Sequence, residues 1–424
     1  MNVVQQWQKR WEDLPQPRKI KVLRLVAFGC YFLALLFFVI YAFGGIRMQV
    51  RDPARVVLFM ESTPGALLAL RHLAKRSDVS IAMIVLTVNT WSFNLNAAYD
   101  NTVAFLTLLK EESLLKYHIP VYYGSSLAQV NAGFDDEIDF SVDGGKAPNT
   151  TACTYRRVLM PSLVLEADTL FGASELLESV PLSAPTSSHD KSDGISGQYE
   201  FFDVALSNYL SNHTAAFLVL GPLTDAADFL QRHLDLRANV NRIFFAGGTL
   251  KAEGNTRLVY PPNQRSEKHA FFDPLAANYI VSGAHGRPMV LLPLDAFPEF
   301  PGTSYHHHAG SRGQHLSSSS AVSISGEVLV RAIVGYGERF GTEKLWPIEM
   351  VAALYFADVV IQNGATVADM ALLVANGFSM SVDGRIGAPN SGQQQQNRFK
   401  VRVVLHLNEE TFWSRVEAVD SMGV

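Results

Sequence analysis

The chain has 424 residues, of which 48% are hydrophobic and 18% are charged, and its formal net charge is -5. A chain of this length and composition holds one large globular domain or two small ones. The mild acidity gives no basic footprint, so no nucleic-acid partner is expected. The 2 Cys residues, Cys30 and Cys153, exclude a disulfide framework, because only one of them lies in the part that is expected to be soluble.

The N-terminal region has a composition of its own. Residues 25–46 contain no charged side chain, and at about 1.5 Å per residue they can cross a hydrocarbon core of about 30 Å. This pattern predicts an N-terminal tail at 1–24, a transmembrane helix at 25–46 that contacts membrane lipid, and a large domain at 52–424. Basic residues are more frequent before the stretch than after it, which predicts that the large domain lies on the side opposite the cytoplasm or matrix.

The compartment follows from two further features of the sequence. The large domain has no disulfide framework, and no signal-peptide cleavage site follows the apolar stretch cleanly. Both features favour a single-pass protein of the inner mitochondrial membrane over one of the secretory pathway or plasma membrane. Asn149 and Asn212 begin the pattern for N-glycosylation, which matters only in the secretory alternative.

Short apolar runs alternate with helical patterns through the large domain. The predicted strands are 56–60, 81–88, 119–123, 215–220, 242–246, 289–292 and 399–407, with helices predicted between many of them, for example at 96–109, 202–209 and 223–234. Such alternation predicts an α/β fold of three layers, with a mostly parallel sheet that is covered on both faces. Functional sites in such folds form beyond the carboxyl ends of the strands.

The loop after the first predicted strand is the most informative motif. It reads Glu-Ser-Thr-Pro-Gly-Ala-Leu-Leu over residues 61–68, and a helical pattern follows it. Five further short motifs follow along the chain. They are Ile-Pro-Val-Tyr-Tyr-Gly at 119–124, Leu-Gly-Pro-Leu-Thr-Asp at 220–225, Ile-Phe-Phe-Ala-Gly-Gly at 243–248, Gly254-Asn255, and Glu267 six residues before Asp-Pro-Leu-Ala-Ala at 273–277. In their order and spacing these motifs resemble those of the nucleoside hydrolases, whose first loop reads D-x-D-P-G-x-D-D.

This resemblance implies a calcium site that the present residues do not complete. In the family one Ca²⁺ holds the ribose diol and the attacking water, and Ca²⁺ requires roughly six to eight oxygen ligands. Leu67 and Leu68 stand at the last two Asp positions of the loop, where they are expected to be helix core. The family also has a late His-Asp pair, which supplies the general acid and the last metal carboxylate. No such pair is present near Glu349, and Glu349 would have to shift its register to replace that carboxylate.

The resemblance therefore predicts a vestigial pocket without metal, cofactor or small-molecule substrate. Its expected members are Glu61, Thr63, Thr90, Asn255, Glu267 and His269, the last of which replaces the Asn of the family's E-F-N motif. The expected function is that of a non-catalytic, membrane-anchored structural or accessory subunit, with other subunits of a mitochondrial ATP synthase or respiratory complex as partners.

Two other functions are compatible with the same residues. One is an active N-glycosyl hydrolase of ribonucleosides with a rebuilt site, whose parts would be Glu61, Glu267, His269 and Glu349. The other is a surface glycoprotein that binds nucleosides without cleaving them.

Overall fold

The computed structural model divides the chain into two units, Met1–Asp52 and Pro53–Val424. The residues that it describes are 11–13, 15–21, 24, 27–33, 53–87, 95–124, 196–258, 263–301, 325–326, 329, 344–345, 347–375, 384–387 and 399–421. No helix within these ranges is long and apolar enough to cross a membrane. Most of the predicted span at 25–46 lies outside them, because residues 25–26 and 34–46 are not described.

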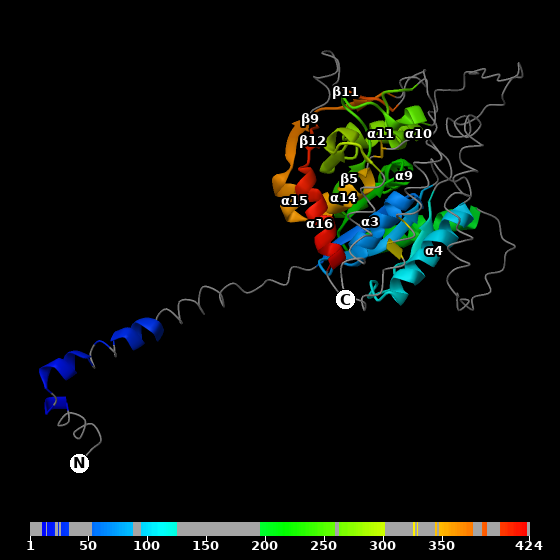
Figure 1. Ribbon diagram of the computed structural model, residues 1–424. Helices are drawn as coiled ribbons and strands as arrows, with labels where there is room; N and C mark the ends of the chain where they lie inside the picture. The colour runs from blue at the N-terminus through cyan, green and yellow to red at the C-terminus, as the bar shows by residue number, and fades with distance from the viewer. Residues whose placement is uncertain are drawn as a thin grey trace, which may run out of the picture. The chain divides into compact units, whose positions relative to one another are not determined.

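An eight-stranded sheet organises the second unit, in the order β3-β2-β1-β4-β5-β6-β12-β9. Figure 1 labels β5, β12 and β9 of this sheet. Every neighbouring pair is parallel except β12 with β9, which is antiparallel. The predicted α/β fold with a mostly parallel sheet is therefore confirmed. The strands are β1 (Ala54–Met60), β2 (Val79–Leu86), β3 (Val121–Tyr123), β4 (Ala215–Leu220), β5 (Val240–Ala246), β6 (Met289–Leu292), β9 (Thr366–Met370) and β12 (Val401–His406).

Helices follow most of these strands, as expected where parallel strands need crossover connections. They are α3 (Pro64–Ala74), α4 (Leu95–Glu111), α8 (Ser196–Asn212), α9 (Thr224–Arg232), α10 (Lys268–Phe272), α11 (Pro274–Val281), α14 (Ile348–Ala357), α15 (Val359–Gly364) and α16 (Glu409–Ser421). Three short 3-10 turns lie at Leu236–Asn239, Asn255–Leu258 and Leu294–Ala296. Two small antiparallel pairs complete the described elements: β7 (Phe300–Pro301) with β8 (Lys344–Leu345), and β10 (Leu373–Val374) with β11 (Ile386–Gly387).

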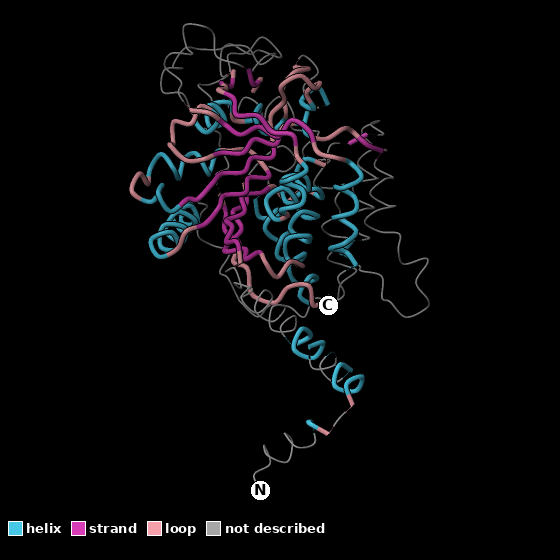
Figure 2. The backbone as a smooth tube through the Cα atoms, turned by 90° about the vertical axis from the view of Figure 1, so that its left-hand side faces the viewer, coloured by secondary structure: helices cyan, strands magenta, loops and turns pink. Residues whose placement is uncertain are grey.

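The sheet separates two apolar cores, one on each face. Alternate side chains of β1 enter different cores, with Leu58 and Met60 in one and Val57 and Phe59 in the other. This follows from the two-residue period of a strand, which sends successive side chains to opposite faces. Helices α3, α14 and α16 cover the first face, and α8, α9 and α11 cover the second, so that the sheet lies between two helical layers (Figure 2).

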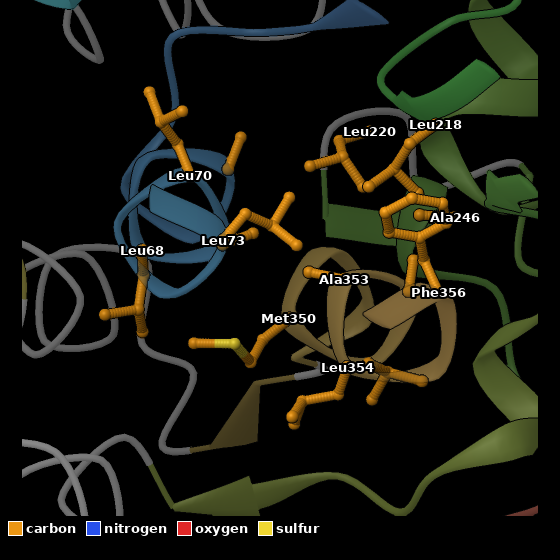
Figure 3. Close-up of a cluster of buried hydrophobic side chains, with 14 of the residues drawn as sticks. Leu68, Leu70, Leu73, Leu218, Leu220, Ala246, Met350, Ala353, Leu354 and Phe356 are labelled. Carbon is orange, nitrogen blue, oxygen red and sulfur yellow. The ribbon is translucent and has the colours of Figure 1, made fainter. Parts of the chain in front are cut away.

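The helix α3 places the two leucines of the first loop in the core. Leu67 is 7% exposed and Leu68 is 1% exposed. Both belong to the core that α3 shares with α14, where Leu73 and Met350 lie between the two helices (Figure 3). The prediction that these leucines are core residues is consistent with this packing.

The strand order reverses at β1, and this reversal determines where a site can form. The chain runs from β1 outward to β2 and β3, and then returns to place β4 on the other side of β1. Connections that leave two adjacent parallel strands in opposite directions open a crevice at the strands' carboxyl ends. The residues that follow β1 and β4, Glu61 and Gly221, stand at this point.

Leu68→Ala is expected to lower the free energy of unfolding of the domain by about 3 kcal/mol, because the truncation leaves a cavity in a tightly packed core. Chemical denaturation followed by far-UV circular dichroism would measure the change. Leu234→Ala is the matched control, since that side chain is 63% exposed, and its effect should stay within about 0.5 kcal/mol. Equal effects of the two substitutions would contradict the placement of Leu68 in the core.

His285 is expected to make the domain less stable in mild acid. Burial lowers the pKa of His285 from 6.5 to about 4. Its neutral ring already satisfies two partners, because Nε2 donates to the Ile280 carbonyl at 2.9 Å and Nδ1 accepts from the Arg287 N–H at 3.1 Å. Protonation therefore favours the unfolded chain, so this contribution is present above about pH 6.5 and is lost as the pH falls toward 4, by roughly 3 kcal/mol.

Denaturation midpoints between pH 4 and pH 7 would test this dependence. The variant His285→Gln should flatten the fall in stability, whereas His213→Gln should not, because His213 is an exposed histidine at the end of α8. A fall that is equally steep in His285→Gln would assign the acid sensitivity to other groups.

Candidate functional site

Glu61 is the first residue beyond β1 and is fully buried. The neighbouring strand provides the space for its side chain, because a Cβ at Gly221 would lie 3.0 Å from Glu61 Cγ and 2.9 Å from Thr87 Oγ1. A glycine at 221 thus allows a carboxylate to lie at the carboxyl edge of the sheet, where β1 and β4 meet.

Glu267 caps α10 and ties it to the end of β5. Its Oε2 accepts hydrogen bonds from three backbone N–H groups, those of Gly248 at 3.0 Å, His269 at 2.9 Å and Ala270 at 3.2 Å. Gly248 adopts a φ of 83°, a left-handed conformation that glycine tolerates, and this conformation accompanies the bond from its N–H to the carboxylate. The other oxygen, Oε1, is buried and has no hydrogen-bond partner among the described residues.

His269 lies between the two carboxylates. Its Nδ1 is 2.8 Å from the Ala246 carbonyl oxygen, which can only accept, so Nδ1 carries the proton and donates it. Nδ1 is also 3.4 Å from Glu267 Oε1, and Nε2 is 3.7 Å from Glu61 Oε1. Nε2 is buried and has no hydrogen-bond partner in the described part of the chain. In the neutral ring its lone pair faces the carboxylate of Glu61.

Lys268 brings a positive charge to the same place. Its side chain is 12% exposed, and Nζ is 3.6 Å from Oε1 of Glu349. Burial lowers the pKa of Lys268, but the charges of Glu61, Glu349 and Glu267 outweigh it and raise that pKa above its ordinary value. The ammonium is therefore charged at neutral pH.

Glu349 reaches the site from the first turn of α14. Its carboxylate lies against the start of α3, because a Cβ at Gly65 would be only 2.8 Å from Glu349 Oε2. The amino end of a helix carries partial positive charge, which favours a carboxylate there. The structure thus places Glu349 beside Lys268 at the start of α14.

Two of the predicted site residues have structural roles. Thr63 is the N-cap of α3, and its Oγ1 accepts from the Ala66 N–H at 3.2 Å. Asn255 Oδ1 accepts from the Lys268 N–H at 2.7 Å and so holds the start of α10. Thr90 lies outside the described residues. The structure thus brings together Glu61, Glu267 and His269 with Glu349, the four residues expected in a rebuilt site. It adds Lys268, whose N–H contacts Asn255.

We call these five residues the carboxylate–lysine cluster: Glu61, Glu267, Lys268, His269 and Glu349. Sequence reasoning missed Lys268, although it occupies the position between Glu267 and His269, where the E-F-N motif has an apolar residue. A charged residue at an apolar motif position was the signal that could have revealed it. Glu349 depends on the packing of α14 against α3, which no local pattern shows.

The cluster does not fit the calcium ion that the resemblance implies. Leu67 and Leu68 offer no oxygen ligand, and an ammonium group lies among the remaining carboxylates. Ca²⁺ requires roughly six to eight oxygen ligands. Across the described ranges, no group of three or more His, Cys, Asp and Glu residues is arranged to hold a metal ion. The chemistry available to these five residues is acid–base catalysis and the stabilisation of positive charge by carboxylates.

The family model and the curated relative that match this chain both describe nucleoside hydrolases. The family model for inosine-uridine preferring nucleoside hydrolase matches residues 65–414. Nucleoside hydrolase 3 of Arabidopsis thaliana is 23% identical over 288 residues, which are 58% of this chain and 29% of that protein, so the match spans less than a third of the relative.

Solved structures match over most of the chain. The inosine-uridine preferring nucleoside hydrolase of Bacillus anthracis has a TM-score of 0.57 at 16% identity, and the purine-preferring ribonucleoside hydrolase of Gardnerella vaginalis has 0.56 at 14% identity. Each match covers 87% of this chain and 99% of the other chain. At such low identity these matches show a shared fold.

These findings correct the prediction that the chain is not an enzyme. The family and the named relatives are nucleoside hydrolases, and the replacement of two loop residues by Leu67 and Leu68 does not show inactivity. The matches also give no support to the predicted role as an accessory subunit of an ATP synthase or respiratory complex. With residues 65–414 matched, well over half of its 424 residues, the chain belongs to the inosine-uridine preferring nucleoside hydrolase family.

Proposed function

We propose that the protein is an N-glycosyl hydrolase of ribonucleosides whose site is rebuilt around the carboxylate–lysine cluster. The observation that carries this proposal is the buried Nε2 of His269, which has no hydrogen-bond partner in the described part of the chain and lies 3.7 Å from Glu61 Oε1. Buried polar atoms without protein partners are rare, and they call for a catalytic role or a bound molecule. Family membership supports the same reading.

The pair formed by Glu61 and His269 is suited to activate water. Both facing atoms are acceptors when the ring is neutral, because the proton of His269 is committed to the Ala246 carbonyl. A water molecule about 2.8 Å from each atom can donate one hydrogen to each of them across a separation of 3.7 Å. The pair would then take a proton as the water oxygen bonds to the anomeric carbon of the sugar.

The remaining groups of the cluster are suited to bind and stabilise the sugar. Cleavage of the bond between the anomeric carbon and the base passes through a transition state with positive charge on the sugar, and the bonding electrons leave with the base. Carboxylates aimed at that charge lower the barrier. Lys268 and Glu349 carry the exposed part of the cluster, at 12% and 8%, so the sugar approaches from their side and its hydroxyls meet the Lys268 ammonium.

A membrane anchor at 25–46 remains a separate proposal, supported by the uncharged stretch and by the basic residues before it. It concerns where the enzyme acts rather than its chemistry. Protease protection of the large domain in sealed vesicles would test it, and digestion of that domain in vesicles that stay sealed would contradict the proposed orientation.

The purified full chain is expected to release free base from at least one of inosine, uridine, adenosine, guanosine and cytidine. Chromatographic detection of the base would measure the rate. Glu61→Gln should lower kcat by about 100-fold or more, because the amide cannot accept the proton of the water. Asp369→Asn is the control, since it alters an exposed carboxylate on β9 that pairs with Arg402, and it should leave the rate unchanged.

Three outcomes would contradict this proposal. Absence of base release above the background rate, with all five nucleosides and a folded protein, would reject hydrolysis. A nucleoside that raises the unfolding temperature without being cleaved would replace the proposal with a nucleoside-binding protein. Release that is unaffected by Glu61→Gln would place the chemistry outside the cluster.

A further inference from the structure

The cluster contains three buried carboxylates and one ammonium group, and this ratio calls for an explanation. Glu61 and Glu267 are fully buried, and the side chain of Glu349 is 8% exposed. Ionised carboxylates are costly to bury unless each has a compensating charge or hydrogen bonds. Each of the three must therefore find its compensation within the fold.

The compensation of each carboxylate can be identified. Glu267 accepts from three backbone N–H groups through Oε2. Glu349 lies at the amino end of α3, with its Oε1 3.6 Å from Lys268 Nζ. The charge of Glu61 is compensated by Lys268, because His269 Nε2, 3.7 Å away, presents a lone pair and no proton. The Lys268 ammonium interacts electrostatically with all three glutamates. One ammonium group, 3.6 Å from Glu349, thus acts electrostatically on three carboxylates that lie just after β1, just before α10 and in the first turn of α14.

We propose that the Lys268 ammonium is the built-in cation of this site and takes the place of a divalent ion there. A lysine ammonium is a compact point charge with three N–H donors, and it can therefore serve several carboxylate oxygens at once. The first loop departs from the D-x-D-P-G-x-D-D pattern in a way that fits this proposal, because three of its four carboxylate positions are held by Thr63, Leu67 and Leu68. A site with fewer carboxylates needs less positive charge to balance it, and an ammonium group carries one positive charge where a divalent ion carries two.

Hydrogen bonds of the surrounding backbone and side chains fix the position of the Lys268 backbone. Its N–H donates to Asn255 Oδ1 at 2.7 Å, and its neighbours Glu267 and His269 are anchored at the end of β5. The stem of the side chain therefore starts from a fixed point inside the cluster. A divalent ion would have to displace the ammonium from a buried position where three negative charges stabilise it.

Removal of the ammonium should let a divalent ion enter the cluster. Water molecules would supply the oxygen ligands that Leu67 and Leu68 do not, and the carboxylates, which are not arranged around a metal ion while the ammonium is present, would turn toward the ion. Glu61, Glu267 and Glu349 would then share an uncompensated space, and carboxylate oxygens are the ligands that Ca²⁺ prefers. The inference concerns the cation of the site and stands whether or not a nucleoside is cleaved, so its test needs no turnover.

The experiment compares unfolding temperatures of the full chain in EGTA and in CaCl₂, with NaCl added to equal ionic strength. The wild-type protein is expected to unfold at the same temperature in both. Lys268→Ala should unfold several degrees lower in EGTA and should regain stability in CaCl₂, because a ligand that binds only the folded state stabilises it. Titration calorimetry should then show one Ca²⁺ bound per Lys268→Ala chain and none at this site in the wild type.

Two further variants make the result specific to the cluster. Lys268→Arg keeps the positive charge and should remain insensitive to calcium. Lys268→Ala combined with Glu349→Gln removes a ligand and should lose the calcium response of Lys268→Ala.

The proposal is overturned if calcium stabilises the wild type and Glu349→Gln abolishes that effect. It is equally overturned if a folded Lys268→Ala protein shows no calcium response. If Lys268→Ala fails to fold, the wild type and Lys268→Arg provide the test. A calcium response in either protein contradicts the proposal, and the absence of a response in both supports it.

Discussion

The attraction between one lysine ammonium and three glutamates is the interaction on which this site depends. Buried carboxylates destabilise a fold unless they are compensated, and here the compensation joins separate parts of the chain. Glu267 ties α10 to the end of β5 through the Gly248 N–H, and Glu349 brings α14 against the first turn of α3. Lys268 then links α10 to α14. The same contacts therefore hold in place the elements that carry Glu61 and His269, the pair to which we assign the activation of water.

The topology of the sheet explains why the cluster forms where it does. Connections leave β1 and β4 in opposite directions, which opens space at their carboxyl ends. Glu61 enters that space directly from β1, and Gly221 leaves room for it at the end of β4. The fold supplies the location, whereas the side chains supply the chemistry, as is general for α/β folds. Replacement of carboxylates by leucine at 67 and 68 accordingly alters the chemistry and leaves the scaffold intact, because both leucines pack into the core.

Much of the fold could be predicted from local sequence, because buried parallel strands read as apolar runs. The run at 56–60 and the run at 215–220 correspond to β1 (Ala54–Met60) and β4 (Ala215–Leu220). Glu61, Glu267 and His269 were found because motifs mark them. Thr63 and Asn255 were assigned to the site, but their side chains hold the starts of α3 and α10, since helix caps use the same polar residues as binding sites. Glu349 was expected in the rebuilt site, but its partner Lys268 was not, because the two residues are far apart in sequence and only packing brings them together.

The most direct test of the account is a crystal structure of the full chain grown in millimolar calcium, with anomalous differences measured for the cation. The account predicts a Lys268 ammonium that lies among the carboxylates of Glu61, Glu267 and Glu349, without an anomalous peak between them. A calcium peak at that place, with the Lys268 side chain turned away from the glutamates, would contradict the claim that the lysine is the cation of the site.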